Sequence, residues 1–238
     1  VLYPDLGYLP GMKAKYGAIV VAGSGKINGF VASRNRAGAY FRTKVTPVNP
    51  QTTAQLAVRN RLGSLSQDWR GLTDAQRAAW NGVVSSFAKT DIFGDLKNPT
   101  GFNLYQRLNN NLITTAQAAI SVPPVPQAVD EVGLTSITAA AGAGTIAVVL
   151  TGAVPATSAV KVFATAPQSP GVTFVKSEYR LITVLAPSAA TPVALGTAYV
   201  AKFGSFSANQ KLFFKFVFVD IDSGIESLPV QGFDVSAA

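Results

Sequence analysis

The sequence predicts an α+β protein with three regions: a basic extended β arm, a small three-helix bundle and a β-sandwich. Glycine and basic residues are frequent over residues 1–49, where only short β-like runs occur. Over residues 50–120 apolar residues recur at helical spacing. Short apolar runs about ten residues apart fill residues 127–238, as in a β-sandwich. We expect the proline-rich residues 121–126 to form a stiff linker between the last two regions.

The amino-acid composition excludes most kinds of catalytic site and metal site. The 238 residues include no cysteine and no histidine, so thiolate nucleophiles, imidazole bases and zinc sites built from these residues are excluded. The 12 acidic residues are scattered along the chain. We therefore expect neither an enzyme nor a cofactor. No apolar run reaches the roughly 20 residues of a membrane helix, so we also expect no membrane partner.

A hairpin is predicted within the arm. The runs INGFVAS (27–33) and AYFRTKV (39–45) alternate apolar and polar residues and flank a turn at residues 34–38. A further run, AIVV, occupies residues 18–21. Because the arm has little apolar mass of its own, we expect it to need a partner surface to become ordered.

The stretch Gly23-Ser24-Gly25-Lys26 has the letters of a phosphate-binding loop. Such a loop needs a glycine five positions before the Gly-Lys pair and a Ser or Thr directly after it. Val20 and Ile27 occupy those positions, and the residues that follow alternate like a hairpin instead of opening a helix. We therefore expect no nucleotide site here.

The net charge of +8 is concentrated in the first half of the chain. Residues 1–124 hold 14 Lys or Arg against 5 Asp or Glu, whereas residues 125–238 hold 6 against 7. No acid lies between Asp5 and Asp68. This charge predicts an acidic partner, either nucleic acid or a negatively charged protein face. The residues that we expect to bind it are Arg34, Arg36, Tyr40, Arg42, Lys44, Arg59 and Arg61.

Three interpretations of these cations remain open at the level of sequence. The cations can bind phosphates, and Tyr40 between them can stack on bases. They can equally form a solvated strand face, or an arm that lies over an acidic neighbour in an assembly. Charge alone does not separate these interpretations.

Three helices are predicted in the second region. Asn49-Pro50 marks the first start, Thr73 to Gln76 form a capping box, and Asn98-Pro99-Thr100 mark the third start. The apolar stripes are Val58, Leu62, Leu65 and Trp69; then Trp80, Val83, Val84 and Phe87; then Phe102, Tyr105, Leu108 and Leu112.

The two tryptophans frame a segment similar to the junction between two helices of HMG-box proteins, which bend DNA. Trp69 and Trp80 at this spacing more often pack a helical hairpin together, and the basic residues precede the segment instead of lining it. We therefore expect both tryptophans to belong to the core.

The third region contains five prominent apolar runs that we expect to be strands. They are TIAVVL (145–150), SAVKVFAT (158–165), EYRLITVL (178–185), TAYVAKF (197–203) and KLFFKFVFVD (211–220).

The run VDIDSGIES (219–227) allows two interpretations. Asp220, Asp222 and Glu226 could turn oxygens towards a calcium ion, although an EF-hand places its bidentate glutamate much later. The same letters resemble the turn before the last strand of fibronectin type III and related immunoglobulin-like domains. We favour the turn, and the resemblance implies an immunoglobulin-like sandwich over about the last hundred residues. The run TIAVVL lacks the buried tryptophan usual in that family.

A further resemblance covers about residues 25–112. It rests on the succession GKINGFVASRNRAGAYFRTKVTPVNPQTTAQLAVRNRLGSLSQDWRGLTDAQRAAWN (25–81), followed by PTGFNLYQRLN (99–109). This part of the chain is similar to a group of proteins found in tailed bacteriophages and prophages. Membership implies a virion-associated structural protein, in the capsid, tail or neck, whose partners are other virion proteins or copies of itself. No catalytic residues come with the resemblance. A nucleic-acid-binding protein and a glycan-binding module in the last region remain alternatives.

Overall fold

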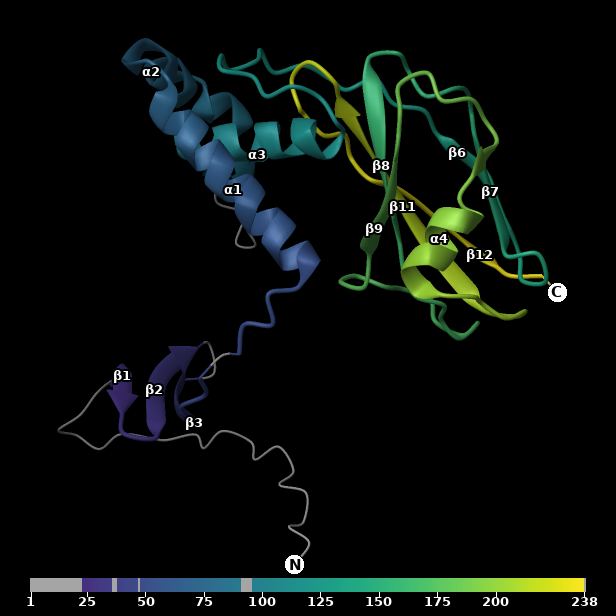
Figure 1. Ribbon diagram of the computed structural model, residues 1–238, viewed down its shortest axis with the longest axis horizontal. Helices are drawn as coiled ribbons and strands as arrows, with labels where there is room; N and C mark the ends of the chain where they lie inside the picture. Colours follow the sequence, from purple (N-terminus) through teal and green to yellow (C-terminus); the bar gives the residue numbers. More distant parts are fainter. Residues whose placement is uncertain (1–22, 36–37, 47, 91–95, 238) are drawn as a thin grey trace, which may run out of the picture. The chain divides into compact units, whose positions relative to one another are not determined.

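The computed structural model describes residues 23–35, 38–46, 48–90 and 96–237. Its helices and antiparallel sheets confirm a mixed α+β protein (Figure 1). The chain divides into two compact units, residues 1–53 and residues 54–238. The helices and the β-rich region therefore belong to one unit, and the basic arm is the other. No helix in the described ranges is long and apolar enough to cross a membrane.

The described part of the first unit is a three-stranded antiparallel sheet in the order β1-β2-β3. Its strands are β1 (Gly25–Ile27), β2 (Phe30–Asn35) and β3 (Gly38–Thr43). The predicted hairpin of β2 and β3 is confirmed, but the prediction of one strand over residues 27–33 is wrong. Asn28 adopts a left-handed φ of 51° and, with Gly29, turns the chain so that Ile27 pairs with Phe30. The run at 18–21 and Arg36 lie outside the described residues.

In the helical region of the second unit, two helices begin where the capping signals predict, whereas the first begins at Thr53, after the predicted start at Asn49-Pro50. The helices of this region are α1 (Thr53–Gly71), α2 (Asp74–Gly82), the 3₁₀ helix η1 (Val84–Phe87) and α3 (Gly101–Thr114). Both hydrogen bonds of the capping box form between Thr73 and Gln76, and the Thr100 hydroxyl accepts from the Asn103 N–H. A two-stranded pair that was not predicted, β4 (Lys89–Thr90) and β5 (Leu96–Lys97), precedes α3.

Both tryptophans pack in the helical core, as predicted. Trp80 is fully buried and its indole N–H donates to the Ser121 carbonyl at 2.9 Å. The Trp69 ring lies 5.7 Å from Phe102 and 5.3 Å from Tyr105 between centroids. These contacts give the tryptophan pair a structural role.

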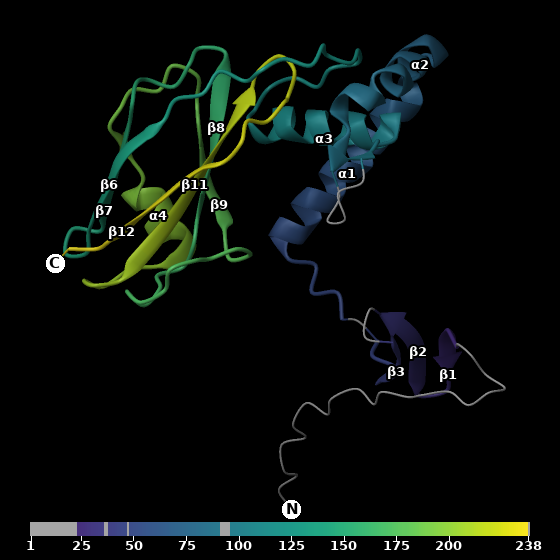
Figure 2. The ribbon, with the colours of Figure 1, turned by 180° about the vertical axis from the view of Figure 1, so that it is seen from behind.

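The first half of α1 does not join this core. Figures 1 and 2 show α2 and α3 against the later part of α1. Val58 is 63% exposed and Leu62 is 55% exposed, although both belong to the predicted buried stripe. Of this stripe, Leu65 is buried and Trp69 is half-buried, so only its C-terminal part packs in the helical core.

Two antiparallel sheets form the β-rich region, in the orders β10-β7-β6 and β12-β11-β8-β9. The first contains β6 (Leu134–Ala140), β7 (Thr145–Leu150) and β10 (Val193–Ala194). The second contains β8 (Ser158–Ala164), β9 (Arg180–Leu185), β11 (Lys211–Asp220) and β12 (Val230–Val235). Phe214, Phe216 and Phe218 of β11 share one buried core with Ile146 and Val148 of β7. The apolar side chains on one side of each strand therefore point towards the other sheet.

The prediction of a strand at 197–203 is wrong, because these residues lie in the helix α4 (Gly196–Phe203). Apolar residues at Leu195, Tyr199 and Phe203 recur every four positions, which is helical spacing. Tyr199 is fully buried, and its hydroxyl donates to the Thr165 carbonyl at 2.8 Å. Burial raises the pKa of Tyr199, so its hydroxyl remains a donor at neutral pH.

Candidate functional site

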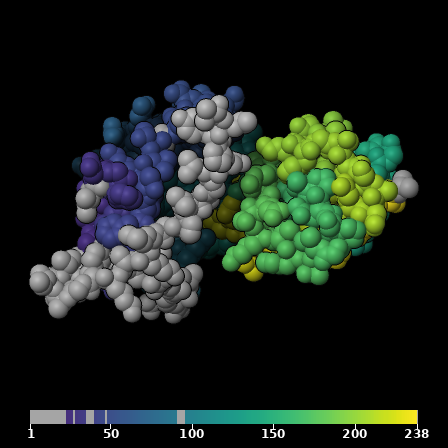
Figure 3. Space-filling model, turned by 90° about the horizontal axis from the view of Figure 1, so that it is seen from below, coloured from purple at the N-terminus to yellow at the C-terminus, as the bar shows by residue number. Residues whose placement is uncertain are grey.

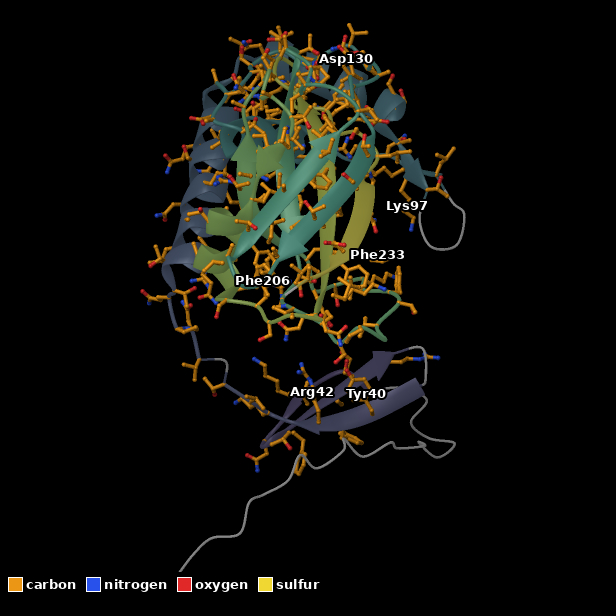
Figure 4. All side chains as sticks on the ribbon, turned by 90° about the vertical axis from the view of Figure 1, so that its right-hand side faces the viewer. Tyr40, Arg42, Lys97, Asp130, Phe206 and Phe233 are labelled. Carbon is orange, nitrogen blue, oxygen red and sulfur yellow. The ribbon has the colours of Figure 1, made fainter. Side chains whose placement is uncertain are left out.

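The sheet of the first unit has one basic face. In the pairing register Lys26, Val31 and Arg42 form one row, and Ser33 and Tyr40 form the next row on the same face. Lys26 and Arg42 are exposed, and Tyr40 is half-buried. Figure 4 shows Tyr40 and Arg42 side by side on β3. This face presents two cations beside a phenol, with no acid in this part of the sequence to neutralise them.

The opposite face of the same sheet is largely apolar. Phe30 and Ala32 of β2 lie opposite Thr43 and Phe41 of β3. The Phe30 side chain is 57% exposed, whereas Ala32 is buried. Arg34 follows on this face, because its position alternates with Asn35 and Ser33. The predicted cations of the sheet are therefore divided between two unlike faces.

The remaining predicted cations lie in different settings. Lys44 follows β3 and is exposed, and its backbone N–H donates to the Gly29 carbonyl at 2.7 Å. Arg59 and Arg61 lie in α1, in the second unit. The Arg61 guanidinium donates to Asn110 at 3.2 Å and to Thr114 at 2.7 Å, so it ties α1 to α3. Arg61 therefore already serves an internal contact.

Exposed apolar side chains are frequent in the same basic part of the sequence. Phe30, Val45, Val48, Leu56, Val58 and Leu62 are all exposed. They share a segment that contains no acidic residue, between Asp5 and Asp68. Basic charge and exposed apolar surface thus occur together along residues 30–62.

The three carboxylates of the VDIDSGIES run do not converge. The Asp220 carboxylate accepts the backbone N–H groups of Asp222 at 3.2 Å and of Ser223 at 2.7 Å. Asp222 is exposed, and Glu226 pairs with Lys161. The run forms a turn after β11, as we favoured. Within the described ranges no group of three acidic side chains could hold a metal ion.

This turn binds α3 to the four-stranded sheet through a buried polar chain. Asn111 of α3 donates to the Gly224 carbonyl at 2.9 Å and accepts from the Lys161 ammonium at 3.1 Å. Lys161 also forms an ion pair with Glu226. Asn111 and Lys161 are both buried. The cluster thus fixes the helices on the sheet, and it holds Lys161 by two partners instead of leaving a free amine for chemistry.

A cavity of about 220 Å³ adjoins this cluster, lined by Arg107, Glu226 and Lys89 among others. Burial lowers the pKa of the Arg107 guanidinium, and the nearby Glu226 carboxylate opposes this shift. The Arg107 guanidinium also lies 5.9 Å from the centroid of Phe87. Sequence reasoning missed this cluster because its members are far apart along the chain.

Sequence reasoning also missed an aromatic pocket on the outer face of the four-stranded sheet. It is lined by Phe213 of β11, Phe233 of β12, and Phe174 and Tyr179 from the segment between β8 and β9. The alternating residues Lys211-x-Phe213-x-Lys215, which share a strand face, were the one signal for it.

No protein family, no curated protein and no solved structure matches this chain.

Proposed function

We propose that this chain is a non-enzymatic structural protein of a tailed-bacteriophage virion, either a capsid decoration or a tail or neck component. It would bind neighbouring subunits, or copies of itself, through the basic arm. The observation that carries this proposal is the sheet β1-β2-β3, which presents Lys26 and Arg42 on one face and the exposed Phe30 on the other. Arg34, Arg42 and Lys44, with Arg36 outside the described residues, are the proposed anchoring cations.

A small sheet of this kind is marginal alone. Isolated sheets with few strands need a buried apolar face to be stable in water. Here Phe30 is exposed on one face, and β1 and β3 are the outer strands of the sheet among the described residues. Edge strands readily accept a strand from a partner. Docking on a neighbouring subunit would cover Phe30 and pair an edge at the same time.

Exposed apolar residues favour a protein partner over nucleic acid. Nucleic-acid affinity depends largely on cations that contact phosphates. Large exposed apolar side chains such as Val45, Val48 and Val58 contribute instead to protein interfaces. An acidic protein face with an apolar centre would complement both features of this segment.

The strand order supports an immunoglobulin-like sandwich for the β-rich region. Counting β6 as the first strand, the first, second and fifth strands form one sheet, and the third, fourth, sixth and seventh form the other. Constant-type immunoglobulin domains distribute their strands in the same way, except that the fourth joins the first sheet. Sandwiches of this kind, including fibronectin type III domains, fit a module displayed on a particle.

Replacing Arg34, Arg36, Arg42 and Lys44 together by serine is expected to lower incorporation into particles by about tenfold or more. Many weak copies summed by symmetry make attachment sensitive to each contact. The measurement is the copy number of the chain in purified particles by quantitative mass spectrometry. A matched control replaces the exposed cations Arg70, Lys89, Lys176 and Lys202 by serine, which removes the same charge outside the arm.

Two results would contradict different parts of the proposal. Absence of the unaltered chain from particles would reject the virion role. Unchanged incorporation of the arm variant, with the unaltered chain present, would reject the arm as the anchor.

A nucleic-acid-binding protein is the second candidate, because Arg42 and Tyr40 are neighbours on one sheet face. This function predicts that the full chain retards DNA in a gel at low salt and that affinity falls steeply as salt rises. The four-serine arm variant should lose the retardation, and the control variant should retain it. If the unaltered chain causes no retardation even at low salt, nucleic-acid binding is rejected.

A further inference from the structure

The aromatic pocket on the outer face of the four-stranded sheet has a volume of about 140 Å³. Phe213 is buried at its base, and its ring centroid lies 5.7 Å from that of Phe233. Phe233 is 55% exposed and Phe174 is 72% exposed. Figure 4 shows Phe233 projecting from β12 into a dense group of side chains. The segment between β8 and β9, which contributes Phe174 to the pocket, lies in the green part of Figure 3.

Two lysines stand beside these rings. Lys211 and Lys215 alternate with Phe213 along β11 and share its face. The Lys211 ammonium lies 3.9 Å from the Phe233 ring centroid and 5.3 Å from that of Phe213. The Lys215 ammonium lies 4.7 Å from the centroid of Phe163 and 5.0 Å from that of Tyr179. Aromatic faces thus surround both charges.

Neither lysine has an acidic partner within the described part of the chain. Two acids lie close in sequence to the pocket residues, but each is engaged elsewhere. Glu178 accepts from the Gln168 amide at 2.8 Å, and Asp234 accepts from the Ala139 N–H at 2.7 Å. Lys211 is only 8% exposed, so its charge is partly removed from water and balanced by ring faces alone. An anionic group at the pocket would complete the pairing of these charges.

We propose that this pocket binds an acidic saccharide, with one sugar ring against the aromatic side chains and its carboxylate towards Lys215, the more exposed of the two lysines beside the rings. Pockets that enclose a whole small ligand start at about 300 Å³, so this smaller pocket suits a single ring. The C–H face of a sugar ring packs on aromatic rings, and Gln231 and Thr173 on the pocket wall supply hydrogen-bonding groups for its hydroxyls. The pocket belongs to the second unit, and the inference stands independently of the virion role.

Other anions fit this site less well. Bidentate phosphate recognition favours arginine, and the cations beside these rings are lysines. A polynucleotide needs a basic track along its backbone. Residues 125–238 hold 6 basic against 7 acidic residues, so this region offers no such excess. A monosaccharide unit with one carboxylate matches the size of the pocket and the positive charge beside its rings.

The test is calorimetric titration of the full chain at low salt with tetragalacturonate, and with its methyl ester as the neutral match. We expect the acid form to bind and the ester to bind at least about tenfold more weakly, because esterification removes the charge that the lysines attract. Phe174→Ser, at an exposed position, and Lys215→Gln should each weaken binding of the acid by about fivefold or more. Lys202→Gln, an exposed cation on α4, is the charge-matched control and should leave affinity unchanged.

Thermal melting of each variant checks that folding is retained, and Phe174→Ser keeps the test valid if Lys215→Gln does not fold. Equal affinity for acid and ester would overturn the role of the lysines. Failure of the acid to bind, or binding that Phe174→Ser leaves unchanged, would overturn the site. Equal or tighter binding of a tetrathymidylate oligonucleotide that Phe174→Ser abolishes would overturn the saccharide assignment.

Discussion

Substituting Gly224 by alanine is expected to destabilise the second unit by about 3 kcal/mol and to loosen α3 from the sheet. A Cβ at this position would lie 2.4 Å from the Leu108 carbonyl oxygen and 3.0 Å from the Leu112 side chain. Gly224 also has a φ of +71°, a backbone conformation that residues other than glycine rarely adopt. Because the nearest obstacle is helix backbone, α3 itself must move. The change in free energy of unfolding can be measured by urea denaturation.

Gly144→Ala is the matched control for this prediction. Gly144 has a similar φ of +60°, but a Cβ there would meet nothing closer than the Val200 side chain at 3.8 Å. The Gly144→Ala variant should therefore lose only about 1 kcal/mol of unfolding free energy, which is the cost of a positive φ at alanine. Equal losses in the two variants would refute the close approach between Gly224 and α3. Limited proteolysis within residues 116–133 should be faster in Gly224→Ala if the helices have loosened.

Removing the Glu226 carboxylate by Glu226→Ala is expected to destabilise the chain by about 2 kcal/mol. The Lys161 side chain is only 8% exposed and would be left with Asn111 as its remaining partner. The loss should fall below that of a fully buried pair, because the Glu226 side chain is 36% exposed. Urea denaturation of Glu226→Ala, of Lys161→Met and of the double variant Lys161→Met/Glu226→Ala measures these losses.

The double variant should be more stable than the sum of the two single losses predicts, because it removes the unpaired buried charge. The pair Asp74 and Arg77 on α2 provides a control cycle. It is an i,i+3 pair whose aspartate side chain is 98% exposed, so its coupling should be close to zero. Strictly additive losses at Lys161 and Glu226 would show that this ion pair contributes no net stability.

The helices were predictable where the signals are local. The capping box at Thr73 and Gln76 and the Thr100 cap act over three residues, so the sequence alone locates the helix starts. The helix at 196–203 was missed because Val200 and Tyr199 favour strands, whereas burial of Leu195 and Tyr199 on one side decided for a helix. In this segment the spacing of the residues that face the core outweighs their intrinsic preference for strands.

The candidate sites were less predictable than the elements that carry them. Asn111, Lys161 and Glu226 are unremarkable in sequence, and only the packing of α3 on the sheet joins them. Similarly, Phe174 and Phe233 meet at one pocket because β11 pairs with both β8 and β12. Contacts between residues so distant along the chain leave no local pattern to read.

By itself the sequence determined that this protein combines helices with β-structure, that it lacks cysteine and histidine chemistry, and that its charge lies in an acid-free N-terminal segment. These properties follow from composition and from interactions between near neighbours. Only the tertiary structure decided that Arg34 and Arg42 lie on opposite faces, that Lys161 is paired, and that two lysines lie beside the rings of an aromatic pocket. The physical reason is that strand register and helix packing, set by the whole core, determine which side chains share a surface.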